Sequence, residues 1–402
     1  MATIRKRTWT TSSGEIRTGF SVNIEGEGNR QRRQFATRRE AEAYRLEIEG
    51  QVKGGTFRPD GGRITVAETA DRFVTYCQGR MQRRERMSRQ NYKVYEGHIH
   101  NYICPDPARH AGRTLPPRMR AFAHGIGGVR LAQLTPRAVG EFRDRLRDAG
   151  VSIITTRKIL GTLQQLLAYA ISQDLIGINA ARGVKVIGRR GEGAKKIVPP
   201  TKEAMRRLIE VSEEDFRTQL MLASATGVRA GELHALRWRH IDLEVGEVKI
   251  ETRVDAYGDE DVTKTAAGMR TIPLGAPIVA ALKEWKLAAR RKEPDDLVFP
   301  NRRGWYTSHD NMVKRKFLPL FDRLARLHAE DPGKHPEPPA RFNWHALRHF
   351  AISCWIEAGL SPKTVQTFAG HSSLQVTMDR YGHLFKSDDH RRAMDSIAKD
   401  LF

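Results

Sequence analysis

Residues 343–350 read NWHALRHF, and this stretch holds three basic or titratable side chains at helical spacing. His345, Arg348 and His349 occupy positions i, i+3 and i+4, which lie on one face of an α-helix. Cationic side chains that stand side by side repel each other, so a plain surface helix gains nothing from this arrangement. The stretch therefore predicts a neighbouring group that relieves the repulsion, and the rest of the sequence narrows its identity.

The whole chain is strongly basic. Its 402 residues include 69 lysines and arginines against 47 aspartates and glutamates, which gives a formal net charge of +22. This balance predicts attraction to a polyanion, and nucleic acid is the usual one. A basic protein kept soluble by its charge and a protein bound to acidic lipid are the alternatives.

The cysteines and the apolar segments bear on the cellular compartment. Cys77, Cys104 and Cys354 lie far apart, which argues against a disulfide framework or a zinc ribbon and fits a reducing compartment. The first twenty residues lack the apolar stretch of a signal peptide, and no segment approaches the roughly 18 consecutive apolar residues of a membrane span. We therefore expect a soluble cytoplasmic protein with no membrane partner.

The N-terminal region, residues 1–55, predicts a small α+β domain. Alternation of apolar and polar residues indicates three strands, at about 4–10, 15–24 and 30–36. A capping box at 37–40 then opens a helix that runs to about Ile48. The polar strand face carries Arg32 and Arg33, which are candidates for a sheet that inserts into a DNA groove; a solvated edge strand defended by charge is the alternative.

Residues 65–187 predict an all-helical domain with a strongly basic surface. A second capping box, TVAE at 65–68, opens one helix, and Thr135 followed by Pro136 opens another. Between residues 155 and 171 the apolar side chains fall on one side at helical spacing. Two linkers and one irregular excursion are rich in Gly and Pro; they lie at 53–63, 188–200 and 104–127.

Residues 200–402 predict a mixed α/β domain that is mostly helical, with two or three strands within 246–275. Arg229 follows a turn-permitting Gly at the start of a helix, and Glu232 lies three residues on, where it can hold the guanidinium. The other unusual residues come from the motifs TKTAAGMRTIPL (263–274), HALRH (345–349) and GHSSLQVTMDRYGH (370–383); they are Lys264, His345, Arg348, His371 and Tyr381.

Taken singly, each of these residues has an ordinary structural explanation. An Arg at a helix start is usually a surface residue, and Tyr381 alone would be a core or interface residue. His345 and His349 would form a polar pair or bind zinc, but a zincin helix needs Glu directly after the first His, and Ala346 stands there. No metal site and no cofactor are expected.

Taken together, these residues resemble the tyrosine recombinase (phage integrase) family. The pattern of that family is an Arg followed by an acidic residue, then a hairpin Lys, His-x-x-Arg, Gly-His and a nucleophilic Tyr. All six catalytic positions of the pattern match, at Arg229, Lys264, His345, Arg348, His371 and Tyr381. Glu232 matches the acidic position, and His349 is expected to support the site by structural hydrogen bonding rather than by catalysis.

The resemblance covers 201–402 by motif and 65–185 more loosely. It implies a multidomain, mainly α fold with small β elements: an α+β arm-DNA-binding domain, an all-α core-DNA-binding domain and a mixed α/β catalytic domain, at 1–55, 65–187 and 200–402. The excursion at 104–127 departs from the family pattern and looks like an insertion into the helical domain.

The activity implied is that of a site-specific recombinase, or integrase, of a phage or mobile element. Such an enzyme cleaves and rejoins DNA through a covalent 3′-phosphotyrosine. Two Arg forks would bind the phosphate oxygens, while His345 handles the proton of Tyr381. His371 would donate to the phosphate and Lys264 would protonate the leaving 5′-oxygen. The face of NWHALRHF is then expected to look onto a DNA phosphate.

The resemblance also implies partners: double-stranded DNA with core and arm sites, a homotetramer on DNA, and accessory DNA-bending or directionality factors. The location implied is the prokaryotic cytoplasm, on the nucleoid. Beyond Tyr381, an apolar tail at 382–402 would either fold back or dock on a neighbouring protomer, as in relatives. The alternatives are a chromosome-dimer-resolving tyrosine recombinase, a type IB topoisomerase and a catalytically silent DNA-binding regulator.

Overall fold

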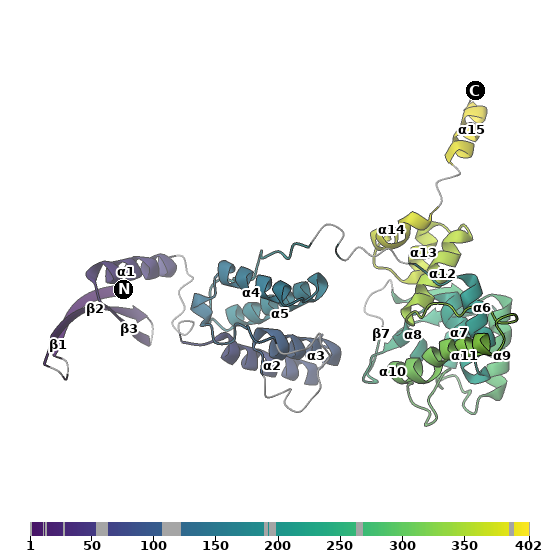
Figure 1. The fold of residues 1–402 in the computed structure, drawn as a ribbon, viewed down its shortest axis with the longest axis horizontal. Coiled ribbons are helices and arrows are strands. Elements are labelled where there is room, and N and C mark those ends of the chain that lie inside the picture. The colour runs from purple at the N-terminus through teal and green to yellow at the C-terminus, as the bar shows by residue number, and fades with distance from the viewer. Residues whose placement is uncertain are drawn as a thin grey trace. The chain divides into compact units, whose positions relative to one another are not determined.

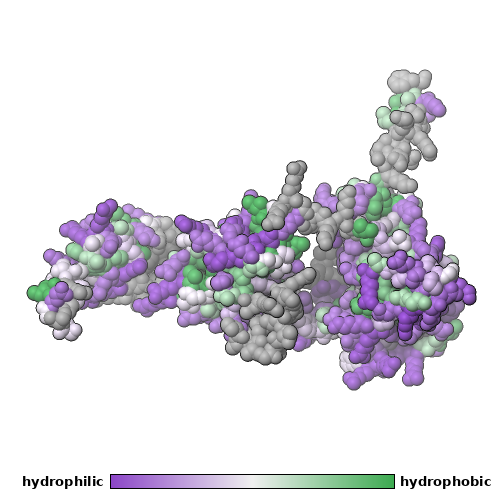
Figure 2. All heavy atoms as spheres, in the orientation of Figure 1, coloured by the Kyte–Doolittle hydropathy of each residue, from purple (hydrophilic) through white to green (hydrophobic). Residues whose placement is uncertain are grey.

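The structure is a computed structural model. It describes residues 2–10, 12, 14–26, 29–53, 63–106, 122–188, 192, 198–262, 268–385 and 390–401. The chain separates into two units, 1–195 and 196–402 (Figure 1), and each is described by itself. Hydrophilic atoms cover most of the visible face of both (Figure 2), as the high net charge requires. Within the described residues, no helix combines the length and apolar character that crossing a membrane requires.

The first unit begins with a three-stranded antiparallel sheet, β1 (Ala2–Thr10), β2 (Ile16–Gly26) and β3 (Asn29–Phe35), in the order β1-β2-β3. Helix α1 (Arg38–Lys53) follows, opened by the predicted capping box of Thr37 and Glu40. It continues past the predicted end at Ile48, because the first Gly-Gly pair comes only at positions 54 and 55. The hydrophobic core between this sheet and α1 is small: among the described residues, its buried apolar members are Val22, Ala41 and Ile48.

The same unit contains a group of helices with its own core. These are α2 (Val66–Gln82), α3 (Arg89–His98), which runs into a π-helical turn η2 (Ile99–Ile103), the short η5 (Leu131–Gln133), α4 (Pro136–Asp148) and α5 (Ile153–Ser172). The predicted caps are present, since Thr65 and Glu68 form a capping box and Thr135 accepts from the backbone of Ala138. Most of the apolar side of α5 lies in the core, as predicted, with Leu163 and Leu166 fully buried; Ile171, predicted on the same side, is 37% exposed in the last turn of the helix. The three cysteines of the chain are free.

The second unit starts with helices α6 (Lys202–Glu210), α7 (Glu214–Thr226) and α8 (Ala230–His234), followed by the 3-10 turn η6 (Trp238–His240). An antiparallel sheet of order β4-β5-β8 follows, formed by Ile241–Asp242, Glu247–Ile250 and Arg270–Pro273. Strands β6 (Thr252–Val254) and β7 (Glu260–Val262) form a separate hairpin. The described residues of 246–275 thus hold four strands, and the prediction of two or three was wrong because this hairpin is short and polar.

The rest of the second unit is helical. Its elements are α9 (Ala276–Ala288), α10 (His309–Met312), η8 (Val313–Phe317), α11 (Leu318–Glu330), α12 (His345–Glu357), α13 (Pro362–Ala369), α14 (Leu374–Tyr381), η9 (Gly382–Leu384) and α15 (His390–Leu401). Helix α12 joins two cores, since Leu347 belongs to the main one and Ile352 to a smaller one with Tyr381. Residues 343–350 therefore include the start of α12, the helix that contributes side chains to both cores of this unit.

Candidate active site

The turn between α7 and α8 presents Arg229. Helix α7 ends at Gly227, whose φ of +58° is left-handed, and a Cβ there would meet the Ala351 side chain at 3.1 Å. The chain then turns so that Arg229 becomes the N-cap of α8. The Glu232 carboxylate reaches back to the Arg229 backbone N–H at 2.8 Å and receives the Arg229 guanidinium at 2.8 Å. Glu232 therefore binds the guanidinium of Arg229, as the sequence predicted, and its backbone N–H as well.

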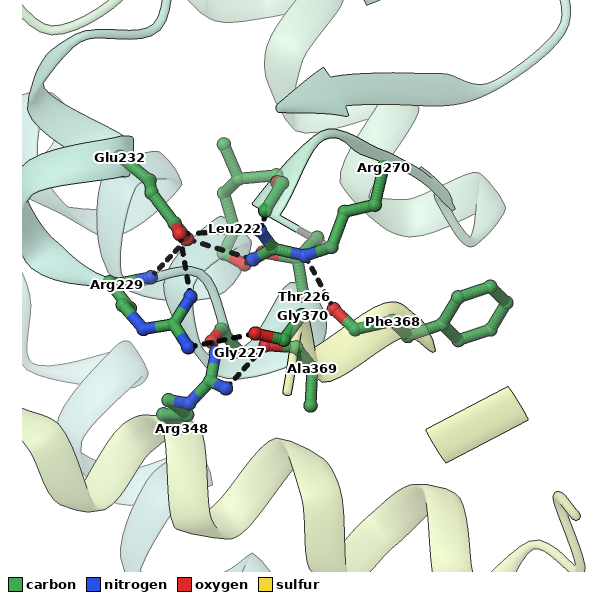
Figure 3. Close-up of polar contacts among 11 residues, drawn as sticks. Leu222, Thr226, Gly227, Arg229, Glu232, Arg270, Arg348, Phe368, Ala369 and Gly370 are labelled. Carbon is green, nitrogen blue, oxygen red and sulfur yellow. Dashed lines mark hydrogen bonds and ion pairs between the residues drawn. The ribbon is translucent and has the colours of Figure 1, made fainter. Parts of the chain in front are cut away.

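Three arginines converge on this turn (Figure 3), and together with Glu232 we call them the arginine cluster: Arg229, Arg270 and Arg348. The Arg270 side chain is 1% exposed and pairs with Glu232 at 2.8 Å. Arg348 donates to the Gly227 carbonyl at 2.9 Å and to the Ala369 carbonyl. The cluster thus joins α8, α12 and the start of β8.

The C-terminal end of α13 supplies acceptors to all three arginines. The carbonyls of Phe368, Ala369 and Gly370 accept from Arg270, Arg348 and Arg229 respectively. The last carbonyls of a helix lack intrahelical partners and carry its partial negative charge, so guanidinium groups satisfy and complement them. Gly370, at a φ of +62°, then turns the chain into His371.

The charges of the arginine cluster do not cancel. Three guanidinium groups face one carboxylate, so two positive charges have no carboxylate within the cluster. Burial works to raise the pKa of Glu232, but hydrogen bonding from Arg270 and the charges of Arg270 and Arg229 lower it to about 2. Burial and the charges of Arg229 and Arg270 lower the pKa of Arg348 to about 9. An added anion would relieve this repulsion, and the Arg229 side chain, 42% exposed, is where it can enter.

Tyr381, the last residue of α14, is buried at 1% exposure. Its hydroxyl lies 2.5 Å from Nδ1 of His349 on α12. The His371 ring stacks on the Tyr381 ring with centroids 6.2 Å apart, and its Nδ1 lies 2.9 Å from the Thr377 hydroxyl. Burial raises the pKa of Tyr381, against the lowering effect of Arg348 and Arg380. The phenol therefore sits between two imidazoles and beside positive charge.

The two histidines of HALRH differ in what they contact. The sequence interpretation gave the proton of Tyr381 to His345 and a structural role to His349. In the structure, His349 meets the phenol, and His345 packs edge-on against His349 with centroids 4.8 Å apart. Burial and neighbouring charge lower the pKa of His345, and they lower that of His349 to about 4 and that of His371 to about 3. All three imidazoles are therefore neutral near pH 7.

The remaining predicted residues lie elsewhere. Lys264 falls at 263–267, outside the described residues. Arg32 and Arg33 are exposed on β3 of the first unit, and the Arg33 guanidinium lies 4.9 Å from the centre of the Tyr44 ring. The structure therefore brings together five of the six predicted catalytic residues with Glu232 and His349.

Sequence reasoning missed Arg270. A signal was present, because strand alternation places Arg270 on the same side as Ile272, which is buried. A cation on the buried side of a strand needs a carboxylate partner. The short spacing in the sequence pairs Glu232 with Arg229 and gives no sign that the same carboxylate also binds Arg270.

Comparisons with known proteins agree with this geometry. Residues 200–388 match the family model described as "Phage integrase family". The ICEBs1 integrase of Bacillus subtilis (strain 168) is 26% identical over 274 residues, which covers 65% of this chain and 70% of the relative. A XerC-like tyrosine recombinase of Caldanaerobacter subterraneus subsp. tengcongensis is 23% identical over 377 residues, 87% of this chain and 86% of the relative.

Solved structures show the same fold. A Tn1549 transposon integrase in complex with transposon right end DNA has a TM-score of 0.59 at 17% identity, covering 83% of this chain and all of the other. A lambda integrase dimer bound to a core site has a TM-score of 0.53 at 18% identity and covers 95% of both chains. These likenesses confirm the expected fold class, mainly helical and multidomain with small antiparallel sheets.

The sequence relatives place this chain among enzymes that break and rejoin DNA strands, and its fold is that of multidomain tyrosine recombinases. The segment that holds the site, residues 200–388, belongs to the phage integrase family, and the chain is a site-specific tyrosine recombinase. The findings do not favour a type IB topoisomerase or a silent DNA-binding regulator.

Proposed function

We propose that this recombinase is the integrase of a phage or other mobile element, and that Tyr381 is its nucleophile. The observation that carries the proposal is the buried phenol, 2.5 Å from a neutral imidazole and close to an arginine cluster with surplus positive charge. Double-stranded DNA is the substrate, and the scissile phosphate enters at the exposed edge of Arg229. The repulsion among the side chains of NWHALRHF is then relieved by that phosphate.

The chemistry follows from the positions of the side chains. The Tyr381 oxygen attacks phosphorus while His349 Nδ1 accepts its proton. Arg229 and Arg348 stabilise the charge that develops on the non-bridging oxygens, which planar guanidinium forks suit better than ammonium groups. We assign the Thr377 hydroxyl as donor to His371 Nδ1, which leaves the proton of His371 on Nε2, available to the phosphate. Lys264 protonates the 5′-oxygen as it leaves.

A trapping experiment tests this proposal. A nicked suicide substrate, whose 5′-fragment diffuses away after cleavage, should accumulate a covalent protein–DNA adduct with the wild-type protein. Tyr381→Phe removes only the hydroxyl oxygen, so it should bind the same DNA in a gel shift and form no adduct. An adduct that persists in Tyr381→Phe would mean that another residue is the nucleophile. The DNA to use is that flanking the protein's own gene, after footprinting.

We assign a separate DNA-binding role to each remaining domain. Residues 65–187 clamp the core site together with residues 200–402, and residues 1–55 bind distinct arm sites. The exposed arginines of β3 support the second assignment. Deletion of residues 1–60 should leave core-site cleavage unchanged and remove binding to the arm sequence. Unchanged binding to every DNA tested would argue against an arm-binding role.

Strand exchange calls for four protomers on two duplexes, acting with accessory DNA-bending or directionality factors. Helix α15 supports an assembly role, because its residues Met394, Ile397 and Leu401 are 64%, 50% and 69% exposed. We assign this face to a neighbouring protomer. Truncation after Ser387 should keep binding to one core site and abolish recombination between two. A truncated protein that recombines normally would contradict this assignment.

A further inference from the structure

The β6–β7 hairpin leads into the segment that carries Lys264, and its strand β6 packs on the helix that begins beside Arg229. Val262, at the end of β7, comes two residues before Lys264 in the sequence. On α8, a Cβ at Gly231 would lie 2.5 Å from the Val254 carbonyl oxygen of β6. The backbone of the hairpin therefore lies directly against α8, and only glycine fits at that position.

A group of three polar side chains makes a second connection between the hairpin and the chain that follows α8. Arg237 Nη2 lies 2.9 Å from Glu260 Oε2 on β7 and 2.9 Å from the Tyr306 hydroxyl, and that hydroxyl also donates to Glu260. Arg237 Nη1 donates to the Asp295 carbonyl at 2.6 Å. The Arg237 and Glu260 side chains are 22% and 28% exposed. We call Arg237, Glu260 and Tyr306 the Glu260 triad.

Partial burial makes the Glu260 triad more than a surface ion pair. Burial works to raise the pKa of Glu260, but hydrogen bonding from Tyr306 and Arg237 lowers it. Charge-assisted hydrogen bonds of this kind are stronger and more directional than contacts between exposed ions. The triad therefore holds the start of β7 in a defined place.

The far side of the Lys264 segment is fixed as well. Arg270 comes six residues after Lys264, at the start of β8, and its buried guanidinium pairs with Glu232 of α8 at 2.8 Å. Glu260 comes four residues before Lys264, so the chain between them spans at most about 14 Å. Both flanks of the Lys264 segment are therefore bonded to α8 or to a residue shortly after it: Glu260 to Arg237, and Arg270 to Glu232. Arg229 is the N-cap of the same helix.

We propose that the Glu260 triad positions β7 so that Lys264 can reach the leaving 5′-oxygen while Arg229 holds the same phosphate. The inference rests on the proposed role of Lys264. The members of the triad are positioning residues, since none of them needs to touch DNA. Their loss should weaken the protonation step and leave the attack by Tyr381 intact.

The chemistry of the leaving group separates these two steps. As the Tyr381 oxygen bonds to phosphorus, the P–O5′ bond breaks, its electron pair goes to O5′, and O5′ takes a proton from Lys264. If sulfur replaces that bridging oxygen, the leaving group is the anion of a thiol with a pKa of about 8.5, which departs without a proton. A 5′-bridging phosphorothiolate substrate therefore bypasses Lys264 and any residue that acts only through it.

The test compares single-turnover cleavage of oxygen and sulfur substrates by full-length variants. Glu260→Gln and Tyr306→Phe should slow cleavage of the oxygen substrate by about tenfold or more and leave the sulfur substrate within about twofold of wild type. Tyr306→Phe removes only one hydroxyl, so the comparison can still be made with this variant if Glu260→Gln does not fold. Asp261→Asn is the matched control, because Asp261 is the next residue on β7 and pairs with Arg253 inside the hairpin; both its rates should equal wild type.

A double variant adds a second readout. If the triad acts through Lys264, Glu260→Gln should cost nothing further in a Lys264→Ala background. Equal losses on the oxygen and sulfur substrates, or a normal rate on the oxygen substrate, would overturn the inference while leaving the role of Lys264 in place. A normal rate of Lys264→Ala on the oxygen substrate would instead overturn the proposed role of Lys264 itself.

Discussion

The arginine cluster of the second unit and the basic strands of the first use the same residue types in opposite ways. In the cluster, Arg348 and Arg270 are buried; Arg348 donates to fixed carbonyls, and Arg270 donates to a carbonyl and to Glu232. On the N-terminal sheet, Arg5, Arg7 and Arg32 are exposed above a small core, in which the described buried apolar residues are Val22, Ala41 and Ile48. A buried guanidinium is held in one orientation and is screened little by salt, whereas an exposed one is accessible to a partner and is screened by salt.

This difference separates two tasks. A transition state needs charges held at fixed positions before the reaction starts, and the cluster meets this need because helix-end carbonyls hold each guanidinium. Attraction to a polyanion needs only many accessible charges, and a small sheet with a minimal core provides them. We therefore expect the cluster to respond to geometry and the sheet to respond to salt.

The largest effect should come from removing the single carboxylate of the cluster. Glu232→Gln leaves buried Arg270 without its counter-charge, and breaking a buried pair costs about 3–5 kcal/mol of unfolding free energy. The matched control is Glu42→Gln on α1. Glu42 pairs with Arg38, and their side chains are 47% and 74% exposed, so this pair should contribute at most about 0.5 kcal/mol to the free energy of unfolding. Denaturant unfolding of the full chain measures both. Equal losses of unfolding free energy in the two variants would contradict the proposed difference between the buried cluster and the exposed sheet domain.

The same pair of variants has a pH dependence with a defined sign. The pKa of Glu232 lies at about 2 in the folded protein, below its ordinary value of 4.5, so its stabilisation is complete above pH 4.5. That stabilisation is lost as the pH falls from about 4.5 towards 2. The difference in unfolding free energy between wild type and Glu232→Gln should therefore shrink over this range. A difference that stays constant down to pH 2.5 would contradict the ion-pair explanation.

A change of geometry at constant charge should have the next largest effect. Arg348→Lys keeps the positive charge but cannot reach the Gly227 and Ala369 carbonyls with one planar fork. We expect the single-turnover cleavage rate to fall by about 10²–10³, the effect of losing one preorganised donor, while the gel-shift Kd stays near wild type. Arg32→Lys on the exposed sheet should change neither quantity. Retained cleavage in Arg348→Lys would show that charge alone suffices.

How much of this was readable from the sequence depends on how local each signal is. The capping boxes at Thr37 and Thr65 and the Thr135–Pro136 helix start were predicted and confirmed, since their hydrogen bonds span three residues. The three N-terminal strands were predicted for the same reason, because alternation is local. The β6–β7 hairpin was not predicted, because its polar strands are too short to show a period.

The site shows the same limit. The motifs located Arg229, Arg348, His371 and Tyr381, which the structure brings together, but no motif says which imidazole of an i, i+4 pair meets the tyrosine. That choice depends on how α14 packs on α12, a contact between residues 32 positions apart. The sequence therefore predicted only a structural hydrogen bond for His349, and Arg270, whose partner Glu232 lies 38 positions away, was not found.

The exposed sheet should show a moderate effect that depends on salt. If Arg32 contacts one phosphate of an arm site, Arg32→Gln should reduce the slope of log Kd against log salt by about 0.9. Between 50 and 200 mM salt, that slope corresponds to about a threefold change in affinity. Gel shifts on arm-site DNA across this range measure it. An unchanged slope would place Arg32 away from the DNA.

The smallest expected change concerns pH, and it tests whether burial in the second unit governs the imidazole at the phenol. The pKa of His349 lies at about 4, because burial and the positive charges of Arg348 and Arg380 disfavour the imidazolium. At pH 6 the ring is then almost entirely neutral and still able to accept the proton of Tyr381.

An imidazole with the ordinary pKa of about 6.5 would instead be about three-quarters protonated at pH 6, and cleavage would fall about fourfold from its value at pH 8. We expect kcat/KM for core-site cleavage, which reports ionisations of the free enzyme, to change by less than about 10% between pH 8 and pH 6 from this group. Arg380 is exposed, so Arg380→Gln removes one of the charges without opening the core, and it should move the acid limb of the profile to higher pH. A wild-type profile that already falls with a midpoint near pH 6.5 would mean that neither burial nor the neighbouring charges lower the pKa of this imidazole. The contrast between the fixed charges of the cluster and the screened charges of the sheet would then not extend to the proton-transfer step.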